Sequence, residues 1–518
     1  MGGRHDGRRG RAVPVRRGRG RGDAGDLPGR AVGGAAPRGG SGPPAGHDPS
    51  GGASPAATKA PGGTSRAPLR IGQTIRLLCD DLAFGEDGVC RHGGYVVFVP
   101  RVLPGELVEA RVTRAGRKFA RAEPLRILRP SPDRVDPRCR HFGTCGGCTW
   151  QHLRYGAQAR RKEDLLRRLL ERQVSAAAAR AVAPVAAMAE PWGFREKVQL
   201  AVRGPAGRPR VGFFRLRSHE IVDIEECPVQ PEESVAQALA AKAVLASRRA
   251  APYDEKTGRG AVRHLVLRRG LRTGDSHLVV VSAIEDDPGV RKAVSGFRAL
   301  KPPLTGASLN LNRWESSVVL GPRTRPLFGN RTWRERVGGL TFEISPASFF
   351  QTNARAAEVL VEEVRDAVPR DPALRVIDLY AGVGLFALSL AGQVGEVVAV
   401  EGNRGAARDG EGNARLNRVG NCRYLSGPVE RFVADRGLGR FGAAVADPPR
   451  EGLGDGVLEG LVRGCRVRRL VLVSCDPLTL ARDLARAGAL GGRVVRVLPV
   501  DMFPHTHHLE AVATVDFP

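Results

Sequence analysis

Short apolar runs separated by glycine and polar residues occupy the chain from about residue 70 to residue 130. Runs of this length that are bounded by turn residues are typical of strands in small antiparallel barrels. The predicted strands are residues 71–78, 94–99, 107–112 and 121–128. We therefore expect residues 69–130 to form a small barrel.

Beyond this barrel the pattern becomes first helical and then mixed. Residues 151–175 predict a basic helix whose apolar stripe packs in a core, with the stripe made of Leu165, Leu166, Leu169 and Leu170. The strand-like runs that follow are residues 197–202, 264–267, 277–282 and 317–320. The pattern therefore predicts an α+β central domain, which we place at residues 131–335.

From about residue 337 onward, strand-like and helical segments alternate. The strand-like runs are residues 375–379, 396–400, 443–446 and 469–473. A glycine loop and an apolar helix follow the first of them. Alternation of this kind predicts a parallel sheet with helices on both faces. We expect residues 336–518 to form an α/β doubly wound, Rossmann-like domain, so that the chain is a multidomain protein.

Residues 1–68 differ from the rest of the chain in composition. They hold 19 of the 66 glycines and nine of the 37 prolines, together with 12 basic and 4 acidic residues, and they show no apolar periodicity. A segment that can bury little apolar surface remains disordered. We expect a disordered basic tail and assign no function to it.

The charge balance indicates the class of partner. The chain carries 81 Lys and Arg against 54 Asp and Glu, and +8 of its net charge of +27 lies in residues 1–68, which leaves +19 on the remainder. An excess of this size favours a polyanionic partner such as nucleic acid, and Arg114, Arg117 and Lys118 of the predicted barrel could contact phosphates. No apolar stretch approaches the roughly 20 residues of a membrane span, and no signal peptide is visible. We expect a cytoplasmic protein without a membrane partner.

Three of the nine cysteines lie close together, as Cys139, Cys145 and Cys148 in a C-x5-C-x2-C arrangement. Glycines between the last two allow the loop to turn both thiols to one side. A fourth, Cys227 in CPVQ, would complete a set of four thiolates, which either zinc or an iron-sulfur cluster accepts. The isolated cysteines are expected to be small core residues, and they are Cys79, Cys90, Cys422 and Cys465.

The C-terminal domain carries the motifs of a nucleotide-like cofactor site. DLYAGVGLFALSLA, residues 378–391, places a glycine loop between a predicted strand and a helix, where a cofactor can approach the backbone. Glu401 ends the next strand, and a carboxylate there can bind a ribose diol. Asp447 opens DPPR after a later strand. DPP in this place resembles the substrate-side motif of S-adenosylmethionine-dependent methyltransferases, which dehydrogenases lack.

The neighbouring residues indicate which atom is methylated. Enzymes that methylate exocyclic amines usually place an aromatic residue after the two prolines, and Arg450 stands there instead. Carbon 5 of a pyrimidine becomes nucleophilic only after a thiolate adds to carbon 6. Cys475, which follows a predicted strand in VLVSCDP, is the candidate nucleophile. Glu510, in DMFPHTHHLE, is the candidate base that removes the proton from carbon 5.

Longer motifs show a resemblance to known families. The stretch from Gly85 to the end of VLPGE at Glu106 resembles the TRAM domain, an RNA-binding barrel of the OB type. PRCRHFGTCGGCTWQHL with the distant CPVQ resembles the cluster motif of the bacterial uracil-5 RNA methyltransferases. Six further motifs follow in that family's order, namely FFQTN, DLYAG, VEG, DPPREGL, SCDP and DMFPHTHHLE. The resemblance runs from about residue 70 to the end and is greatest to the 23S rRNA branch.

The resemblance implies methylation of carbon 5 of a uridine in 23S rRNA, with S-adenosylmethionine as cofactor and Cys475 and Glu510 as nucleophile and base. The implied cofactor contacts are Gln351, Tyr380, Glu401 and Asp447. The implied ligands of one 4Fe-4S cluster are Cys139, Cys145, Cys148 and Cys227. At Leu385 and Pro428 the chain departs from the polar residues common in the family, so we expect backbone groups to serve there. We expect a monomer that binds RNA.

Other interpretations stay open at this point. Cys475 could be a buried strand-end thiol, and Glu510 a surface carboxylate paired with nearby histidines. For those histidines we expect packing or RNA contacts and no metal, and they are His505, His507 and His508. Relatives that act on tRNA commonly lack the barrel and the cluster, which favours rRNA over tRNA. A noncatalytic RNA-binding assembly factor is a further alternative, against which the intact Cys475, Glu510 and Asp447 argue.

Overall fold

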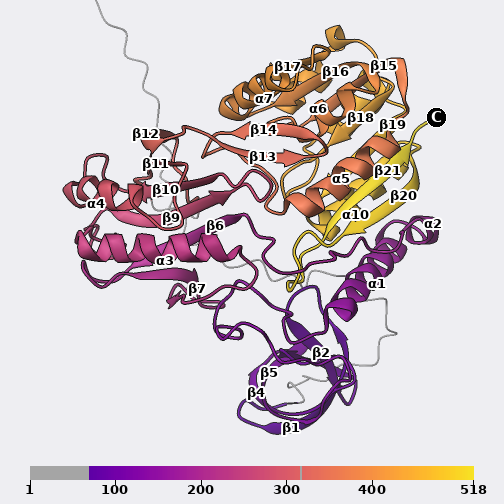
Figure 1. Cartoon of the computed structure of the whole chain (residues 1–518). Helices are drawn as coiled ribbons and strands as arrows, with labels where there is room; N and C mark the ends of the chain where they lie inside the picture. Colours follow the sequence, from indigo (N-terminus) through magenta and orange to yellow (C-terminus); the bar gives the residue numbers. More distant parts are fainter. Residues whose placement is uncertain (1–68, 315–317) are drawn as a thin grey trace, which may run out of the picture. The chain divides into compact units, whose positions relative to one another are not determined.

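The computed structural model describes residues 69–314 and 318–518 (Figure 1). The tail that we expect at residues 1–68 lies outside the described residues. Among the helices in the described ranges, none combines the length and the apolar composition that crossing a membrane requires.

The first described elements are five strands that close into a barrel with the order β1-β2-β3-β5-β4. They are β1 (Thr74–Leu82), β2 (Asp87–His92), β3 (Tyr95–Pro100), β4 (Leu107–Ala115) and β5 (Phe119–Arg129). Alternate side chains fill the interior, among them Val97, Val99 and Val108. The barrel confirms the prediction, but the sequence pattern missed β2, where charged residues and glycine interrupt the apolar run. Pairing with both β1 and β3 supports β2 instead.

A seven-stranded sheet follows, with the order β12-β11-β10-β9-β6-β7-β8. Its strands are β6 (Lys197–Arg203), β7 (Arg210–Phe214), β8 (Ile221–Asp223), β9 (Val262–Arg269), β10 (Ser276–Ser282), β11 (Gly306–Leu311) and β12 (Arg323–Gly329). Strands β10 and β11 are parallel, and the other neighbours are antiparallel. Helices α3 (Glu232–Ser247) and α4 (Pro288–Arg298) pack against this sheet. The arrangement is of the α+β type.

One predicted strand of this region is wrong. Of residues 317–320, Ser317 lies outside the described residues and the rest form a loop. The carbonyl oxygens of Val318 and Val319 accept hydrogen bonds from the Asn312 side-chain amide at 2.7 and 3.0 Å. A side chain thus satisfies backbone groups that a neighbouring strand would otherwise pair, so the apolar run needs no sheet.

The C-terminal sheet has seven strands in the order β17-β16-β15-β18-β19-β21-β20. They are β15 (Asp371–Leu379), β16 (Val394–Glu401), β17 (Cys422–Ser426), β18 (Ala443–Ala446), β19 (Arg469–Ser474), β20 (Arg493–Val500) and β21 (Glu510–Asp516). The strands from β17 to β19 are parallel, and β21 is antiparallel to both of its neighbours. A hairpin of β13 (Trp333–Val337) and β14 (Leu340–Ile344) precedes the sheet.

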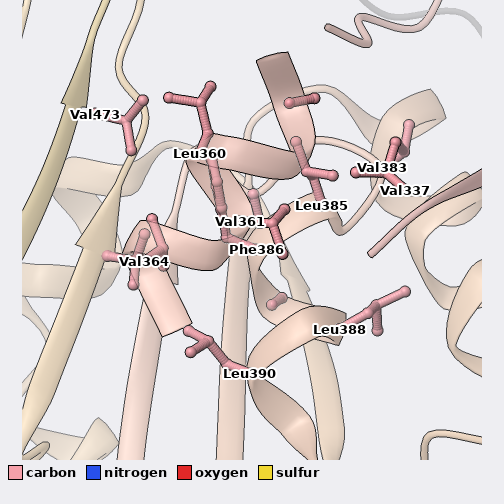
Figure 2. Close-up of a cluster of buried hydrophobic side chains, with 14 of the residues drawn as sticks. Val337, Leu360, Val361, Val364, Val383, Leu385, Phe386, Leu388, Leu390 and Val473 are labelled. Carbon is pink, nitrogen blue, oxygen red and sulfur yellow. The ribbon is translucent and has the colours of Figure 1, made fainter. Parts of the chain in front are cut away.

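Helices cover both faces of this sheet, because successive strand residues point to opposite sides. One face packs on α5 (Ala354–Ala367), α6 (Leu385–Ala391) and α7 (Arg404–Leu416). Figure 2 shows this core, where Leu360 of α5, Phe386 of α6 and Val473 of β19 belong to one cluster. The other face packs on α1 (Tyr155–Gln173), α2 (Ala176–Arg180), α8 (Val429–Ala434), α9 (Val457–Glu459) and α10 (Pro477–Ala489). The predicted doubly wound sheet is therefore confirmed.

Helix α1 belongs to this C-terminal core, although it precedes the central sheet in the chain. Its predicted leucine stripe is buried, and Leu166, Leu169 and Leu170 share a cluster with Leu480 and Leu484 of α10. Figure 1 shows α1 beside α10. The helix therefore connects the cysteine-rich segment that precedes it to the sheet that carries the candidate catalytic residues.

Candidate active site

The topology of the C-terminal sheet brings the predicted site residues to one edge. Tyr380 follows β15, Glu401 ends β16, Asp447 follows β18 and Cys475 follows β19. These positions are all carboxyl ends of parallel strands, where doubly wound sheets hold their sites. Because β21 runs antiparallel to β19, its first residue, Glu510, lies at the same edge.

Cys475 and Glu510 are neighbours across two paired strands. Ser474 pairs with Ala511, and one further step along the antiparallel register sets Cys475 opposite Glu510. Strand β20 holds Glu510 from its other side, through pairing with Val500. Glu510 is 3% exposed, so it is not the surface carboxylate that one alternative requires.

Burial raises the pKa of the Cys475 thiol to about 11, and the carboxylates of Glu510 and Asp447 add to this rise. The Arg450 guanidinium acts in the opposite direction and lowers the pKa of the thiol. A thiol in this state is protonated at neutral pH, whereas the thiolate is the nucleophilic form. Arg450 is therefore placed to stabilise the reactive form of Cys475.

Two carboxylates of raised proton affinity share this neighbourhood. Burial raises the pKa of Asp447 to about 7. Burial, and then the nearby Asp447, raise the pKa of Glu510 well above its usual range, while Arg450 opposes the rise. The Gln351 amide donates a hydrogen bond from Nε2 to Oδ2 of Asp447 at 3.3 Å. A high proton affinity suits Glu510 to a role in which it accepts a proton.

The loop after β15 leaves its backbone open. Gly382 has φ of +55°, and a Cβ at this position would meet no atom within 4 Å. Tyr380 has φ of +62°, in the left-handed region that side-chain-bearing residues rarely adopt. Glu401 accepts hydrogen bonds from the backbone N–H groups of Gly382 at 2.7 Å and Asn403 at 2.6 Å. Two of the residues expected to contact the cofactor, Tyr380 and Glu401, thus lie at this stretch of main chain.

The two positions that depart from the family pattern have different surroundings. Leu385 is the first residue of α6, and its buried side chain packs in the core shown in Figure 2. Pro428 is exposed at the start of α8. That backbone groups contact the cofactor at these two positions stays a prediction.

Two charged residues at this edge had no role assigned from the sequence. Asp378, the last residue but one of β15, is fully buried. Burial and the nearby Asp447 raise its pKa well above the usual range. Arg450 is exposed, and its charge acts on both Cys475 and Glu510. Asp378 opens DLYAG and Arg450 closes DPPR, but a motif does not reveal which charges lie close together.

The three histidines for which we expect packing or RNA contacts lie in the loop between β20 and β21, residues 501–509, which we call the 501–509 loop. The His505 ring stacks on Trp192 with 3.7 Å between ring centroids, and the His507 and His508 rings are 4.3 Å apart. Burial lowers the pKa of His505 and His507 to about 4 and that of His508 to about 3. Neutral, stacked rings agree with the packing interpretation of these residues.

A pocket of about 650 Å³ lies beside Arg450. Its walls come from the cysteine-rich segment, the turn between β7 and β8, and the 501–509 loop, and they combine Arg195 with the aromatic rings of Phe214 and Phe503. Phe214 is 38% exposed. Arginine and exposed aromatic side chains are the residue types that contact phosphates and stack on unpaired bases.

The four predicted ligand cysteines line a separate pocket. Cys139, Cys145 and Cys148 precede α1, whereas Cys227 follows β8. Glycine allows the close approach of the two segments, because the Gly146 backbone N–H donates to a β7 carbonyl oxygen at 3.0 Å and a Cβ would lie only 3.1 Å from that atom. The fold therefore gathers four cysteines that lie up to 88 positions apart in the chain.

All four thiols are free, and burial raises the pKa of each, to about 11 for Cys148 and about 12 for Cys227. The proximity of other thiols adds to the rise, so they cannot all ionise without a compensating cation. Within residues 69–314 and 318–518, no three or more Cys, His, Asp or Glu side chains form a group that could hold a single metal ion. The cysteines predicted to be core residues are buried or packed against a core, and they are Cys79, Cys90, Cys422 and Cys465.

Comparison with known proteins covers both the barrel and the C-terminal sheet. Residues 336–515 match the family described as tRNA (Uracil-5-)-methyltransferase, and residues 68–125 match the TRAM domain. An uncharacterized RNA methyltransferase of Gloeobacter violaceus is 36% identical over 447 residues, which cover 86% of this chain and 97% of that protein. Another, of Halalkalibacterium halodurans, is 34% identical over 454 residues, which cover 87% and 98%.

A solved structure of Pyrococcus abyssi tRNA (uracil-54, C5)-methyltransferase, in complex with S-adenosyl-L-homocysteine, is 29% identical, with a TM-score of 0.68. The match covers 85% of this chain and 99% of that one. The matched share of 85% is larger than the share of the chain that residues 131–518 make up, which is 388 of 518 residues. The match therefore includes part of residues 1–130, where the barrel lies. The Pyrococcus abyssi enzyme acts on tRNA, so the 23S rRNA substrate expected from the motifs stays a prediction.

Both curated relatives are similar to this chain along nearly their whole length, and the family match spans the sheet that carries Cys475 and Glu510. The match to the TRAM domain coincides with the closed barrel of β1 to β5. The chain belongs to the family of RNA uracil methyltransferases.

Proposed function

We propose that this protein methylates carbon 5 of a uridine in RNA, with S-adenosylmethionine as methyl donor, Cys475 as nucleophile and Glu510 as base. The observation that carries the proposal is that Cys475 directly follows β19 and Glu510 begins β21, next to the paired residues Ser474 and Ala511, so that the Glu510 carboxylate acts on the Cys475 thiol. The reaction requires one group that adds to the uracil ring and another that removes a proton from it. A thiol and a carboxyl group of raised proton affinity meet that requirement.

The proposed steps use these groups in turn. The Cys475 thiolate adds to carbon 6, and the electrons of the 5,6 double bond make carbon 5 nucleophilic. S-adenosylmethionine would supply the methyl group that carbon 5 takes up, and S-adenosylhomocysteine would be the leaving group. Glu510 then removes the proton from carbon 5, the 5,6 double bond forms again, and the Cys475 thiolate leaves. Arg450 lowers the pKa of the thiol and so favours the charged form that enters and leaves the reaction.

For the cofactor we propose contacts with Gln351, Tyr380, Glu401 and Asp447. Glu401 lies at the end of β16, where a carboxylate can accept hydrogen bonds from a ribose diol. Asp447 lies close enough to the buried Asp378 to raise the pKa of Asp378. A positively charged cofactor would favour the ionised form of both carboxyl groups.

For the substrate we propose 23S rRNA, on the resemblance of the motifs to that branch. The basic barrel and the pocket lined by Arg195 and Phe214 support an RNA strand with unpaired bases near Cys475. A tRNA is the second candidate, because the similar Pyrococcus abyssi enzyme is a tRNA (uracil-54, C5)-methyltransferase.

For the cysteine pocket we propose one 4Fe-4S cluster held by Cys139, Cys145, Cys148 and Cys227. The four thiols line one pocket, as a cluster held by four cysteines requires, and their sequence contexts resemble the cluster motif of the family. A cluster held by four cysteines has no iron left for a substrate. We therefore propose a structural role for it.

Two variants test the proposed chemistry, with RNA and methyl-labelled S-adenosylmethionine. Glu510→Gln should add, transfer the methyl group and then stall, so that a methylated protein-RNA adduct survives denaturing electrophoresis. Cys475→Ala should form no adduct, even on RNA with 5-fluorouridine at the target, which traps the wild-type enzyme because fluorine cannot leave as a cation. An adduct with Cys475→Ala would move the nucleophile to another residue, and free turnover by Glu510→Gln would remove the base assignment.

The substrate is tested by mass-spectrometric mapping of 5-methyluridine in ribosomal and transfer RNA from cells with and without the gene. Loss of the mark from 23S rRNA supports the first candidate. Loss from tRNA alone supports the second, and loss from neither contradicts the proposed function.

A further inference from the structure

The 501–509 loop, which leads directly into Glu510, is held by polar groups that the proposed chemistry does not use. These groups come from two places, the residues that follow Cys148 and one face of helix α1. Asp501 and Leu509, at the two ends of the loop, are 0% and 2% exposed, so both ends are fixed inside the protein. The middle of the loop is held by hydrogen bonds from those two places.

The residues after Cys148 bind the middle of the loop. The backbone N–H groups of Thr149 and Trp150 both donate to the carbonyl oxygen of His505, at 3.0 and 2.9 Å. In the other direction, the His507 backbone N–H donates to Oγ1 of Thr149 at 3.2 Å. Thr149 thus contacts the loop through its backbone and its side chain, one residue away from a proposed cluster ligand.

Gln158 of α1 joins the same two segments. Its side chain is 0% exposed, and its Oε1 accepts a hydrogen bond from the His505 backbone N–H at 2.9 Å. Its Nε2 donates to the carbonyl oxygens of Trp150 at 3.0 Å and Leu153 at 2.7 Å. His505 has φ of +64°, and a backbone in this region persists only where the surroundings hold it.

Lys162 lies one helical turn after Gln158, on the same face of α1. Its ammonium group is 1% exposed and donates to Oδ1 of Asp501 at 2.5 Å and to the carbonyl oxygen of Phe503 at 3.1 Å. A buried ion pair adds little net stability, because both charges lose their hydration. Its effect here is to restrict the first residues of the loop to one conformation.

We propose that Thr149, Gln158 and Lys162 are positioning residues that hold the 501–509 loop so that Glu510 faces carbon 5 of the covalent adduct. The inference rests on the proposed function. The position of Cys475 is held without the loop. Cys475 follows β19 directly, and the side chain of the next residue, Asp476, accepts hydrogen bonds from backbone N–H groups at the start of α10. Loosening the loop should therefore slow proton removal and leave thiol addition and methyl transfer in place.

The test uses Thr149→Val, which at nearly constant volume removes the hydroxyl that accepts from the His507 backbone N–H and lies 3.3 Å from Nδ1 of the His507 ring. Thr149→Ser restores the hydroxyl. Thr149→Val should lower multiple turnover by about tenfold, the equivalent of about one hydrogen bond. It should also accumulate methylated adduct on natural RNA. Trapping on RNA with 5-fluorouridine, which needs no proton removal, should stay within about twofold of wild type, and Thr149→Ser should recover turnover to within about twofold.

Thr305→Val is the matched control. Thr305 is half-buried like Thr149, and its hydroxyl also bonds to backbone, because it accepts from the Ser276 N–H at 3.0 Å and donates to the Ser276 carbonyl oxygen at 2.8 Å. It immediately precedes β11 of the central sheet, away from the 501–509 loop. The control should show no accumulation of adduct.

Three results would overturn the inference. One is equal loss of turnover and of 5-fluorouridine trapping in Thr149→Val, which would place the effect on RNA binding or thiol addition. The second is accumulation of adduct in Thr305→Val, which would indicate general destabilisation, and the third is unchanged kinetics in Thr149→Val. Failure of the proposed function would give a different result, because the wild-type enzyme would then form no adduct with the fluorinated RNA.

Discussion

The catalytic edge and the cysteine pocket both contain half-buried thiols of raised pKa, but their neighbours differ. At the catalytic edge a single thiol, Cys475, lies opposite a carboxylate and within the influence of Arg450. In the cysteine pocket each thiol has other thiols nearby, and Arg195 is a cation that lowers the pKa of Cys148 and Cys227. Burial alone therefore does not decide what a cysteine does.

The comparison shows how the neighbours make the difference. A lone thiol beside a proton acceptor and a cation can ionise, add to a ring and leave again. Grouped thiols raise one another's proton affinity, and a bound metal centre would supply the positive charge that allows them to ionise. The two regions also meet, because Thr149 follows Cys148 and binds the loop that leads to Glu510.

The largest expected effect separates the two kinds of thiol. Cys475→Ala should lower methylation by more than about a thousandfold, because the covalent step is lost. Its metal content and midpoint of thermal unfolding should stay close to wild type. Cys227→Ala should instead lose metal and unfold at a lower temperature, as measured by metal analysis and calorimetry on anaerobically purified protein.

The wild-type protein should carry about four iron per chain if the pocket holds one 4Fe-4S cluster. Stoichiometric zinc without iron would contradict the cluster. Normal metal content in Cys227→Ala would remove this residue from the ligand set.

The next effect concerns pH. Cys475 and Glu510 both act in their ionised forms, and burial raises the pKa of each, so methylation should fall as the pH is lowered. Arg450→Gln removes a positive charge that lowers both pKa values, so its pH profile should move to higher pH, with about tenfold less activity at neutral pH for a shift of one unit. The measurement is kcat against pH with saturating RNA and S-adenosylmethionine.

Arg463→Gln serves as the control, since Arg463 is exposed and lines a different pocket, at the opposite end of the sheet from Cys475. Its profile should overlie that of the wild type. An unshifted profile in Arg450→Gln would mean that this cation does not act on the ionisation of the thiol.

A smaller effect is expected outside both thiol regions, on the exposed basic residues Arg114, Arg117 and Lys118 of the barrel. Neutralising all three should weaken RNA binding and reduce the slope of log K against log salt by about 2. Each lost phosphate contact lowers the number of counterions that are released when the RNA binds. Arg291 and Lys292, exposed on α4, offer a control pair for the same change. An unchanged slope would locate the RNA surface elsewhere.

The smallest effect is expected from deletion of residues 1–68, to which no function is assigned. Methylation of a purified RNA should remain within about twofold of the full chain, since that segment shows no apolar periodicity with which to pack on either thiol region. Initial rates with saturating substrates provide the measurement. A large loss of activity would identify the segment as an RNA-binding element.

The sequence alone predicted the elements whose patterns are regular. The predicted parallel strands β15, β16, β18 and β19 are mostly apolar runs because both faces of the sheet are covered, and the leucine stripe of α1 repeats at helical spacing. The parallel strand β17, CRYLS, has no such run and was not predicted. Motif chemistry singled out Cys475 and Glu510 from their residue types, because the methylation of carbon 5 requires a thiol and a base. The prediction failed in two further places. Charged residues break the apolar pattern of β2, which pairing with its neighbours supports instead. The predicted strand at Val318 and Val319 is a loop whose carbonyl oxygens bind the Asn312 side chain.

Only the tertiary structure decided which of these residues lie together. Cys475 and Glu510 are 35 positions apart, and only the antiparallel register of β19 and β21 sets them opposite each other. The raised proton affinity of Glu510 depends on burial and on Asp447, which are properties of the packed sheet. The contacts of Thr149, Gln158 and Lys162 with the 501–509 loop span more than 330 positions of sequence. Local patterns carry no information about pairs at such separations, because those pairs form only when the sheet, α1 and the cysteine-rich segment pack against one another.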